Sequence, residues 1–72
     1  MQRKTIRQLR EERNWTQQDL AVKLGVSLAT VYNWERGKYE PRASQFRALG
    51  LAFGVPMESI DLVTEDEGKA AA

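Results

Sequence analysis

The sequence contains neither cysteine nor histidine. Thiolate and imidazole are the usual ligands of structural zinc, so this composition excludes disulfide bonds, thiol chemistry and the common zinc sites. A chain of 72 residues buries only about 60% of the surface that its unfolded form exposes. Its stability therefore has to come from helix packing, with a partner subunit as a further source. We expect a single domain with no cofactor and no metal.

Long apolar runs are also missing. The longest mostly apolar stretch, Leu49 to Met57, is far too short to span a membrane, and the basic N-terminus lacks the apolar region of a signal peptide. The sequence also has no Gly-rich phosphate loop and no clustered pair of carboxylates that could support catalysis. It therefore predicts a cytoplasmic protein that is not an enzyme and has no membrane partner.

The charges are distributed unevenly along the chain. Residues 1–50 carry ten Lys or Arg and five Asp or Glu, a net charge of +5, whereas residues 51–72 carry one Lys and five acids, a net charge of −4. Such an asymmetry suggests an anionic partner for the basic half. Two ordinarily solvated surfaces explain the composition equally well, so the motifs have to decide between these interpretations.

The spacing of apolar residues predicts an all-α domain over residues 1–63, followed by a disordered acidic and alanine-rich tail over 64–72. Apolar periodicity and end signals place the helices at 4–13, 16–24, 28–36, 43–53 and, as a short fifth turn or helix, 56–62. Thr16 and Asp19 have the spacing of a capping box, and Ser27 is a second N-cap. Between these two helices stands a short turn that contains Gly25, so they form a helix-turn-helix unit. Gly50, on the apolar face of the fourth helix, predicts close approach of another helix.

The helix predicted over 28–36 has two different faces. At about 100° per residue, Val31, Trp34 and Glu35 fall on one side, toward the core. The opposite side carries small or neutral residues, with Leu28 at the boundary: Ala29, Thr30, Tyr32 and Asn33. A face without Asp or Glu suits insertion into the groove of a polyanion, where amides, hydroxyls and methyl groups read base edges. A solvated helix surface is the alternative, but such surfaces usually carry Glu and Lys.

The run from Thr16 to Pro41 resembles the phage repressor and Cro family of helix-turn-helix proteins, also called the xenobiotic-response-element family. The matching positions are Thr16-Gln17, Leu20-Ala21, Gly25, Trp34-Glu35-Arg36-Gly37 and Pro41. The resemblance covers residues 3–63. It implies a compact five-helix, lambda-repressor-like fold, with residues 16–24 across the DNA backbone and residues 28–36 in the major groove.

The resemblance also implies roles for individual residues. The base-reading positions are Leu28, Ala29 and Asn33, with Tyr32 beside them. The positions that touch or border phosphates are Thr16, Gln17, Thr30, Arg36, Lys38 and Arg42. Arg10 and Glu35 match a buried ion pair that ties the first helix to the third.

The chain departs from the family at several of these positions. Many members have Arg, Gln or Ser where this chain has Leu28 and Ala29, and residues 28–33 contain no Arg or Lys on the outward face. We therefore expect contacts with thymine methyl groups and bidentate recognition of adenine by Asn33, which together favour an A·T-leaning half-site. Arg42 and Pro56 stand where a Ser cap is usual, so the starts of the last two helices are less well defined.

These observations predict a repressor-like transcriptional regulator that binds double-stranded DNA and associates with the nucleoid. We expect a homodimer, at least on DNA, across a palindromic operator. Leu51 and Met57 are the candidates for its interface, whereas Phe53, Val55 and Ile60 are assigned to the monomer core. The alternative is an antitoxin or protein-interaction module that also binds DNA, with the acidic tail after Leu62 recognising a basic protein partner.

Overall fold

The computed structural model describes residues 3–62, so the tail expected over 64–72 lies outside the described residues. In chain order the elements are β1 (Lys4–Thr5), α1 (Ile6–Glu12), α2 (Gln17–Leu24), α3 (Leu28–Glu35), α4 (Ala43–Phe53), the 3₁₀ turn η1 (Met57–Ser59) and β2 (Ile60–Asp61). Within this part of the chain there are four α-helices, so a fifth helix is not confirmed, and the short fifth element expected over 56–62 contains a turn. The segment after Pro56 makes a single 3₁₀ turn and then becomes extended at Ile60 (φ −94°, ψ 123°).

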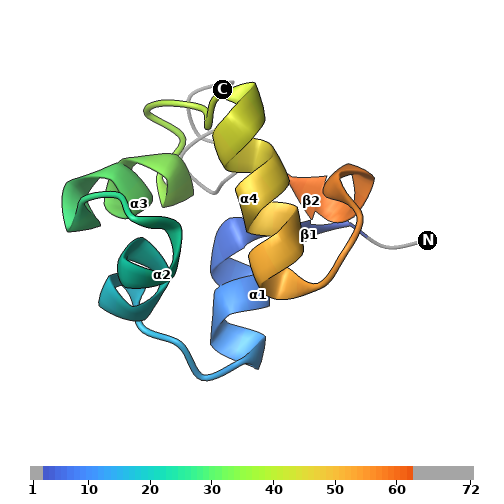
Figure 1. Ribbon diagram of the computed structural model, residues 1–72, viewed down its shortest axis with the longest axis horizontal. Helices are drawn as coiled ribbons and strands as arrows, with labels where there is room; N and C mark the ends of the chain where they lie inside the picture. Colours follow the sequence, from blue (N-terminus) through green and yellow to red (C-terminus); the bar gives the residue numbers. More distant parts are fainter. Residues whose placement is uncertain (1–2, 63–72) are drawn as a thin grey trace, which may run out of the picture.

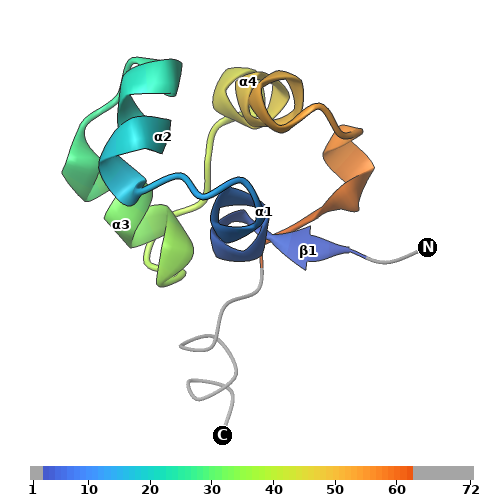
Figure 2. The ribbon, with the colours of Figure 1, turned by 90° about the horizontal axis from the view of Figure 1, so that it is seen from below.

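The helices surround one apolar core. Figure 1 shows α2 and α3 on one side of the molecule, α1 and α4 in the middle, and the two strands on the opposite side; the view from below gives the same order (Figure 2). The largest fully buried side chains come from α2, α3, α4 and β2: Leu20, Val31, Leu49 and Ile60. Burying each such side chain contributes about 1.5–3 kcal/mol. None of the helices described in residues 3–62 is long and apolar enough to cross a bilayer.

The helix ends follow the predicted capping residues. The Thr16 hydroxyl accepts a hydrogen bond from the Asp19 N–H (3.0 Å), and the Asp19 carboxylate accepts one from the Thr16 N–H (2.8 Å). The Ser27 hydroxyl accepts from the Thr30 N–H at the start of α3 (3.1 Å). Gly25 ends α2 in the left-handed conformation, with φ +69°, which a residue with a Cβ adopts only with strain. The sharp turn between α2 and α3 is therefore set by these local interactions.

The two short strands are absent from the sequence prediction. They run parallel, with Lys4 opposite Ile60 and Thr5 opposite Asp61. Thr5 is also the N-cap of α1, where its hydroxyl accepts from the Gln8 N–H (3.1 Å), and α1 consequently begins at Ile6 instead of Lys4. A strand of two residues is too short to show alternation of apolar and polar side chains. The all-α prediction is therefore correct for the body of the domain and incomplete at its ends.

Gly50 is packed closely, but its neighbour is not the one that the sequence predicts. A Cβ at this position would lie 3.0 Å from the Val55 carbonyl oxygen and 3.3 Å from Met57 Cγ. The chain reverses at Gly54, whose φ of +73° brings the next residues back along α4. The close approach thus comes from the segment that follows the helix, and not from another helix.

Candidate nucleic-acid interface

Helix α3 has the two faces that the helical spacing predicts. Val31 and Trp34 are buried in the core. On the other side Leu28 is 47% exposed, Tyr32 is 52% exposed and Ala29 is exposed. Apolar and aromatic side chains at this exposure, on the helix that follows the tight turn, are available for contact with a partner.

The two polar residues on this side of α3 are partly covered. Thr30 and Asn33 are half-buried. The Thr30 hydroxyl lies 2.8 Å from the Ser27 hydroxyl, so part of its hydrogen-bonding capacity serves the start of the helix. The Asn33 amide makes no side-chain hydrogen bond within residues 3–62, whereas its backbone carbonyl accepts from the Lys38 N–H (2.9 Å). The Asn33 amide is therefore the polar group on this face with its donors and acceptor uncommitted.

Basic residues follow the C-terminal end of α3. Arg36 caps the end of α3, and its guanidinium carbon lies 5.5 Å from the centre of the Tyr32 ring. Lys38 lies in the following loop, with Nζ 5.7 Å from the ring of Tyr39, and Arg42 directly precedes α4. Tyr39 is 59% exposed, stands between Lys38 and Glu40 and had no role in the sequence prediction.

Arg10 and Glu35, the residues predicted to form a structural ion pair, are in contact. Arg10 donates two hydrogen bonds to Glu35, from Nε to Oε2 (2.7 Å) and from one terminal nitrogen to Oε1 (3.1 Å). The two side chains are only 10% and 5% exposed. The hydrogen bond to Glu35 raises the pKa of Arg10 above its ordinary value, so the guanidinium stays charged. This bidentate pair ties α1 to the end of α3.

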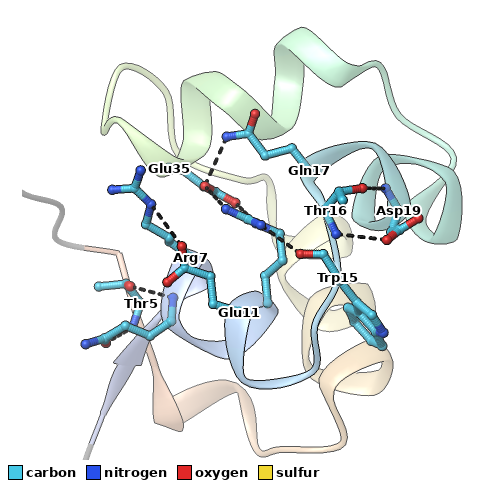
Figure 3. A network of polar contacts seen from close by, with 10 residues as sticks. Thr5, Arg7, Glu11, Trp15, Thr16, Gln17, Asp19 and Glu35 are labelled. Atoms are coloured by element: carbon cyan, nitrogen blue, oxygen red, sulfur yellow. Dashed lines mark hydrogen bonds and ion pairs between the residues drawn. The ribbon is translucent and has the colours of Figure 1, made fainter.

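The start of α2 is connected to the same pair. The Gln17 amide nitrogen donates to Glu35 Oε1 (3.1 Å), and the third Arg10 nitrogen donates to the carbonyl of Trp15 (2.8 Å). Figure 3 shows Gln17 and Glu35 pointing toward each other, with the Thr16–Asp19 cap beside them. The sequence prediction assigned Gln17 to phosphate contact and missed its bond to Glu35. No short motif could reveal it, because the two residues are far apart in the chain.

Aromatic packing holds the connection between α1 and α2. Trp15 stacks on Phe53 of α4 with a ring-centre distance of 5.7 Å, and the Nζ of Lys23 lies 4.6 Å from the Trp15 ring. The guanidinium of Arg13 donates to the carbonyls of Leu9 and Phe53. These contacts fix where α2 begins relative to α4.

The apolar residues assigned to the monomer core and those assigned to the dimer contact differ in exposure. Phe53 (3% exposed) and Ile60 (0% exposed) belong to the core, and Val55 is half-buried against it. Leu51 is 78% exposed and Met57 is 39% exposed. Leu51 is the most exposed of the large apolar side chains among the described residues, so this part of the surface is open to a partner.

The chain matches the model of a protein family described as helix-turn-helix over residues 6–60. An uncharacterized HTH-type transcriptional regulator of Methanocaldococcus jannaschii is 44% identical over 54 residues, which are 75% of this chain and 82% of the relative. One from Methanothermobacter thermautotrophicus is 34% identical over 68 residues, 93% of this chain and 99% of the relative. One from Archaeoglobus fulgidus is 32% identical over 65 residues, 90% and 92% of the two chains.

No solved structure gives a significant match to this chain. The family model nevertheless spans all four α-helices and reaches the first residue of β2, and the relatives cover most of both chains. The resemblance found in the sequence is therefore confirmed, and this chain belongs to the Cro/C1-type helix-turn-helix family.

Proposed function

We propose that this protein is a small transcriptional regulator that binds double-stranded DNA with α3 in the major groove. The observation that carries this proposal is the outward face of α3, which exposes Leu28, Ala29 and Tyr32, lacks acidic residues and ends at Arg36, with Lys38 in the loop that follows. A helix of this width fits the major groove, and flanking cations can reach phosphates on either side of it. Membership of the family and the names of the archaeal relatives support the same function. A regulator of this kind acts on the nucleoid, in the cytoplasm.

Base recognition is assigned to the residues on the exposed side of α3. Leu28 and Ala29 offer only methyl and methylene groups, which pack against thymine methyl groups. The uncommitted amide of Asn33 can donate to and accept from adenine N7 and N6 in a bidentate arrangement. Tyr32 flanks these residues and holds Arg36 over its ring. The set favours half-sites rich in A·T pairs.

Phosphate contacts are assigned to both ends of the helix-turn-helix unit. Thr16 and Gln17 stand at the N-terminus of α2, where backbone N–H groups and the helix dipole favour an anion. On the other side of the recognition face, the phosphate contacts come from the charged residues Arg36, Lys38 and Arg42, with the hydroxyl of Thr30 between the two groups. These contacts set the orientation of α3 in the groove and make the affinity depend on salt.

A homodimer on a palindromic operator completes the proposal. A single recognition helix reads only a few base pairs, and two copies reading half-sites about 34–36 Å apart supply the missing specificity. Leu51 and Met57 are the exposed apolar residues assigned to the contact between copies.

Selection from a random pool of duplexes at two salt concentrations tests the function. We expect enriched A·T-rich half-sites in a palindromic arrangement, and an affinity whose logarithm falls with the logarithm of salt by about 0.9 per phosphate contact. Selection of G·C-only half-sites would contradict the roles of Leu28, Ala29 and Asn33. An affinity that ignores salt, together with no enriched sequence, would overturn DNA binding itself.

The antitoxin alternative depends on the acidic tail, which lies outside the described residues. Truncation after Val63 separates the two functions. DNA binding should survive the truncation because every residue assigned to a DNA contact lies within 16–42. Binding of a basic protein partner should be lost.

A further inference from the structure

The Glu35 carboxylate receives more hydrogen bonds than an ion pair with Arg10 requires. Its Oε2 accepts from Arg10 Nε (2.7 Å), and its Oε1 accepts both from a terminal nitrogen of Arg10 (3.1 Å) and from the Gln17 amide (3.1 Å). The carboxylate is nearly buried, with 5% of the side chain exposed. Gln17, the first residue of α2, is half-buried. The third bond therefore connects an interior charge to a side chain at the edge of the surface.

The bond is directed by groups that are themselves fixed. Arg10 is 8% exposed and bridges Glu35 to the carbonyl of Trp15 (2.8 Å), which lies directly before the Thr16 cap. Arg10 and Glu35 consequently hold the start of α2 through its backbone and through its first side chain. A carboxylate held on both oxygens by a guanidinium has little freedom to rotate, so its Oε1 offers Gln17 a fixed acceptor.

We propose that Glu35 is a positioning residue for DNA binding, because it aims the Gln17 amide at a backbone phosphate. This inference rests on the proposed function. A primary amide carries two N–H donors. One is directed to Glu35, which leaves the other for a phosphate oxygen at the N-terminus of α2. Glutamine loses considerable rotamer freedom when it is ordered, and a side chain that is already held in the free protein loses less of it on binding.

A carboxylate is needed at position 35 for this arrangement. The substitution Glu35→Gln replaces one acceptor oxygen by an N–H₂ donor. If the amide oxygen stays with Arg10 Nε, the new donor faces the donors of Arg10 and Gln17. If the amide is turned around, its donor faces Arg10 Nε. The first orientation breaks the bond from Gln17. The second keeps an oxygen toward Gln17 but places donor against donor at Arg10 Nε, so this oxygen is no longer held in place on both sides. The hold on Gln17 is weakened either way, while the size of the side chain is preserved.

A double-mutant cycle distinguishes positioning from support of the fold alone. The variants are Glu35→Gln, Gln17→Met (an unbranched side chain without donors) and the double variant. The probe is a mixed-sequence duplex long enough for two half-sites, because a phosphate contact does not depend on sequence. We expect each single variant to bind about tenfold more weakly, the loss expected for a hydrogen bond to a charged group. In the Gln17→Met background, Glu35→Gln should change the affinity by less than about twofold.

Equal losses from Glu35→Gln in both backgrounds would overturn the proposal, because Glu35 would then act independently of Gln17. Urea unfolding of each variant sets the conditions under which all of them are folded. The control is Thr5→Ala, which removes the hydrogen bond from the Gln8 N–H that caps α1; it should lower stability and leave duplex affinity unchanged. If Gln17→Met binds as well as the parent, Gln17 has no phosphate contact and the positioning proposal fails with it. If the parent chain binds no duplex, the proposed function fails.

A measurement on the unmodified protein keeps the proposal testable should Glu35→Gln fail to fold. The ¹⁵N relaxation of glutamine side-chain amides reports their mobility on the picosecond-to-nanosecond timescale. Gln18, the next residue, is exposed and serves as the internal reference. The Gln17 amide should be markedly more ordered than that of Gln18 in the free protein. Equal mobility of the two amides would overturn the positioning role even if DNA binding is confirmed.

Discussion

Asn33 illustrates how one side chain can decide the preference of a recognition surface. Its amide has no partner within residues 3–62, and it stands on the side of α3 that carries Leu28 and Tyr32. A bidentate contact with adenine is worth about 1–3 kcal/mol of discrimination. No other amide lies on this face of α3, so its loss cannot be replaced by a neighbour.

The substitution Asn33→Ala should therefore remove the preference for adenine at one position of each half-site. We expect the affinity for the selected duplex to fall by about 1–3 kcal/mol, measured by fluorescence anisotropy. Binding to a mixed-sequence duplex at the same salt concentration is the control and should change little. A variant that keeps the full preference of the parent would show that Asn33 does not read the base.

The environment of Asp19 predicts how the stability of the fold changes at acidic pH. The backbone N–H of Thr16 and then its hydroxyl lower the pKa of the Asp19 carboxyl from its ordinary value of 3.8. A carboxyl whose pKa is lower in the folded state stabilises the fold above its ordinary pKa, and this stability is lost as the pH falls through the folded value. The capping box should therefore weaken below pH 3.8.

The substitution Asp19→Asn should make the stability of the fold less dependent on pH in the acidic range. The variant should be less stable than the parent at neutral pH, and the difference should shrink as the pH falls below about 4. Urea unfolding over a pH series measures the stability of the parent and of the variant. Glu40→Gln removes a carboxylate from an exposed loop and is the control. If the free energy of unfolding of Asp19→Asn depends on pH in the same way as that of the parent, the ionised carboxylate does not stabilise the capping box.

At this scale, sequence reasoning works where the geometry is local. The exposure of Leu28, Ala29 and Tyr32 follows from helical spacing alone, because neighbours within one helix keep a fixed angle. The bond between Gln17 and Glu35 does not follow from spacing. It depends on how α2 and α3 cross, which is set by packing across the core.

Among the elements, α1 is joined to α3 by the ion pair between Arg10 and Glu35. The contribution of this ion pair to stability depends on its burial, because a buried charge that loses its partner has no water to solvate it. Arg7 and Glu11 form a second pair on α1 at 3.7 Å, but both side chains are about half exposed. Exposed pairs of this spacing contribute roughly 0.3–0.5 kcal/mol.

The substitution Arg10→Met should thus lower the free energy of unfolding by about 3–5 kcal/mol, whereas Arg7→Met should lower it by about 0.5 kcal/mol or less. Urea unfolding followed by the fluorescence of Trp15 and Trp34 measures both. Replacing both partners, with Arg10→Met and Glu35→Leu, should recover part of the loss because no charge is left unpaired. Equal losses from the two arginine variants would contradict the assigned role of burial.

The elements themselves were predictable to different degrees. The limits of α2 and α3 are set by Thr16, Ser27 and Gly25, whose caps involve residues three or four positions away. The strands are not encoded this way, since Lys4 and Ile60 meet only after the whole domain has folded. The same reason explains Gly50: its spacing indicated a close neighbour, but not that Val55 supplies it.

For the molecule as a whole, the assembly on DNA is the main prediction. Leu51 is 78% exposed on α4, where a lysine in place of it has room and removes apolar surface. If Leu51 lies between two copies, its replacement places two like charges in the contact, which opposes association.

The substitution Leu51→Lys should abolish the cooperative binding of two chains to a palindromic duplex, so that duplexes carrying a single chain accumulate below saturation. Sedimentation at micromolar concentration, with and without the duplex, measures the stoichiometry. Val22→Lys is the matched control, because Val22 is 68% exposed on α2 and gains the same charge. If both variants bind two chains as the parent does, the contact lies elsewhere on the surface.

The pairing of β1 with β2 also has a consequence for the order of folding. Lys4 and Thr5 meet Ile60 and Asp61 across almost the full length of the described chain, so this ladder closes the longest loop and carries the largest entropy of closure. It should form last and open first, with its amides exchanging fastest among the paired ones. Since the Thr5 hydroxyl also caps α1, opening the ladder loosens the first turn of that helix in the same event. Figure 1 places the ladder on the side of the domain opposite α3, so we expect its opening to leave the recognition helix in place.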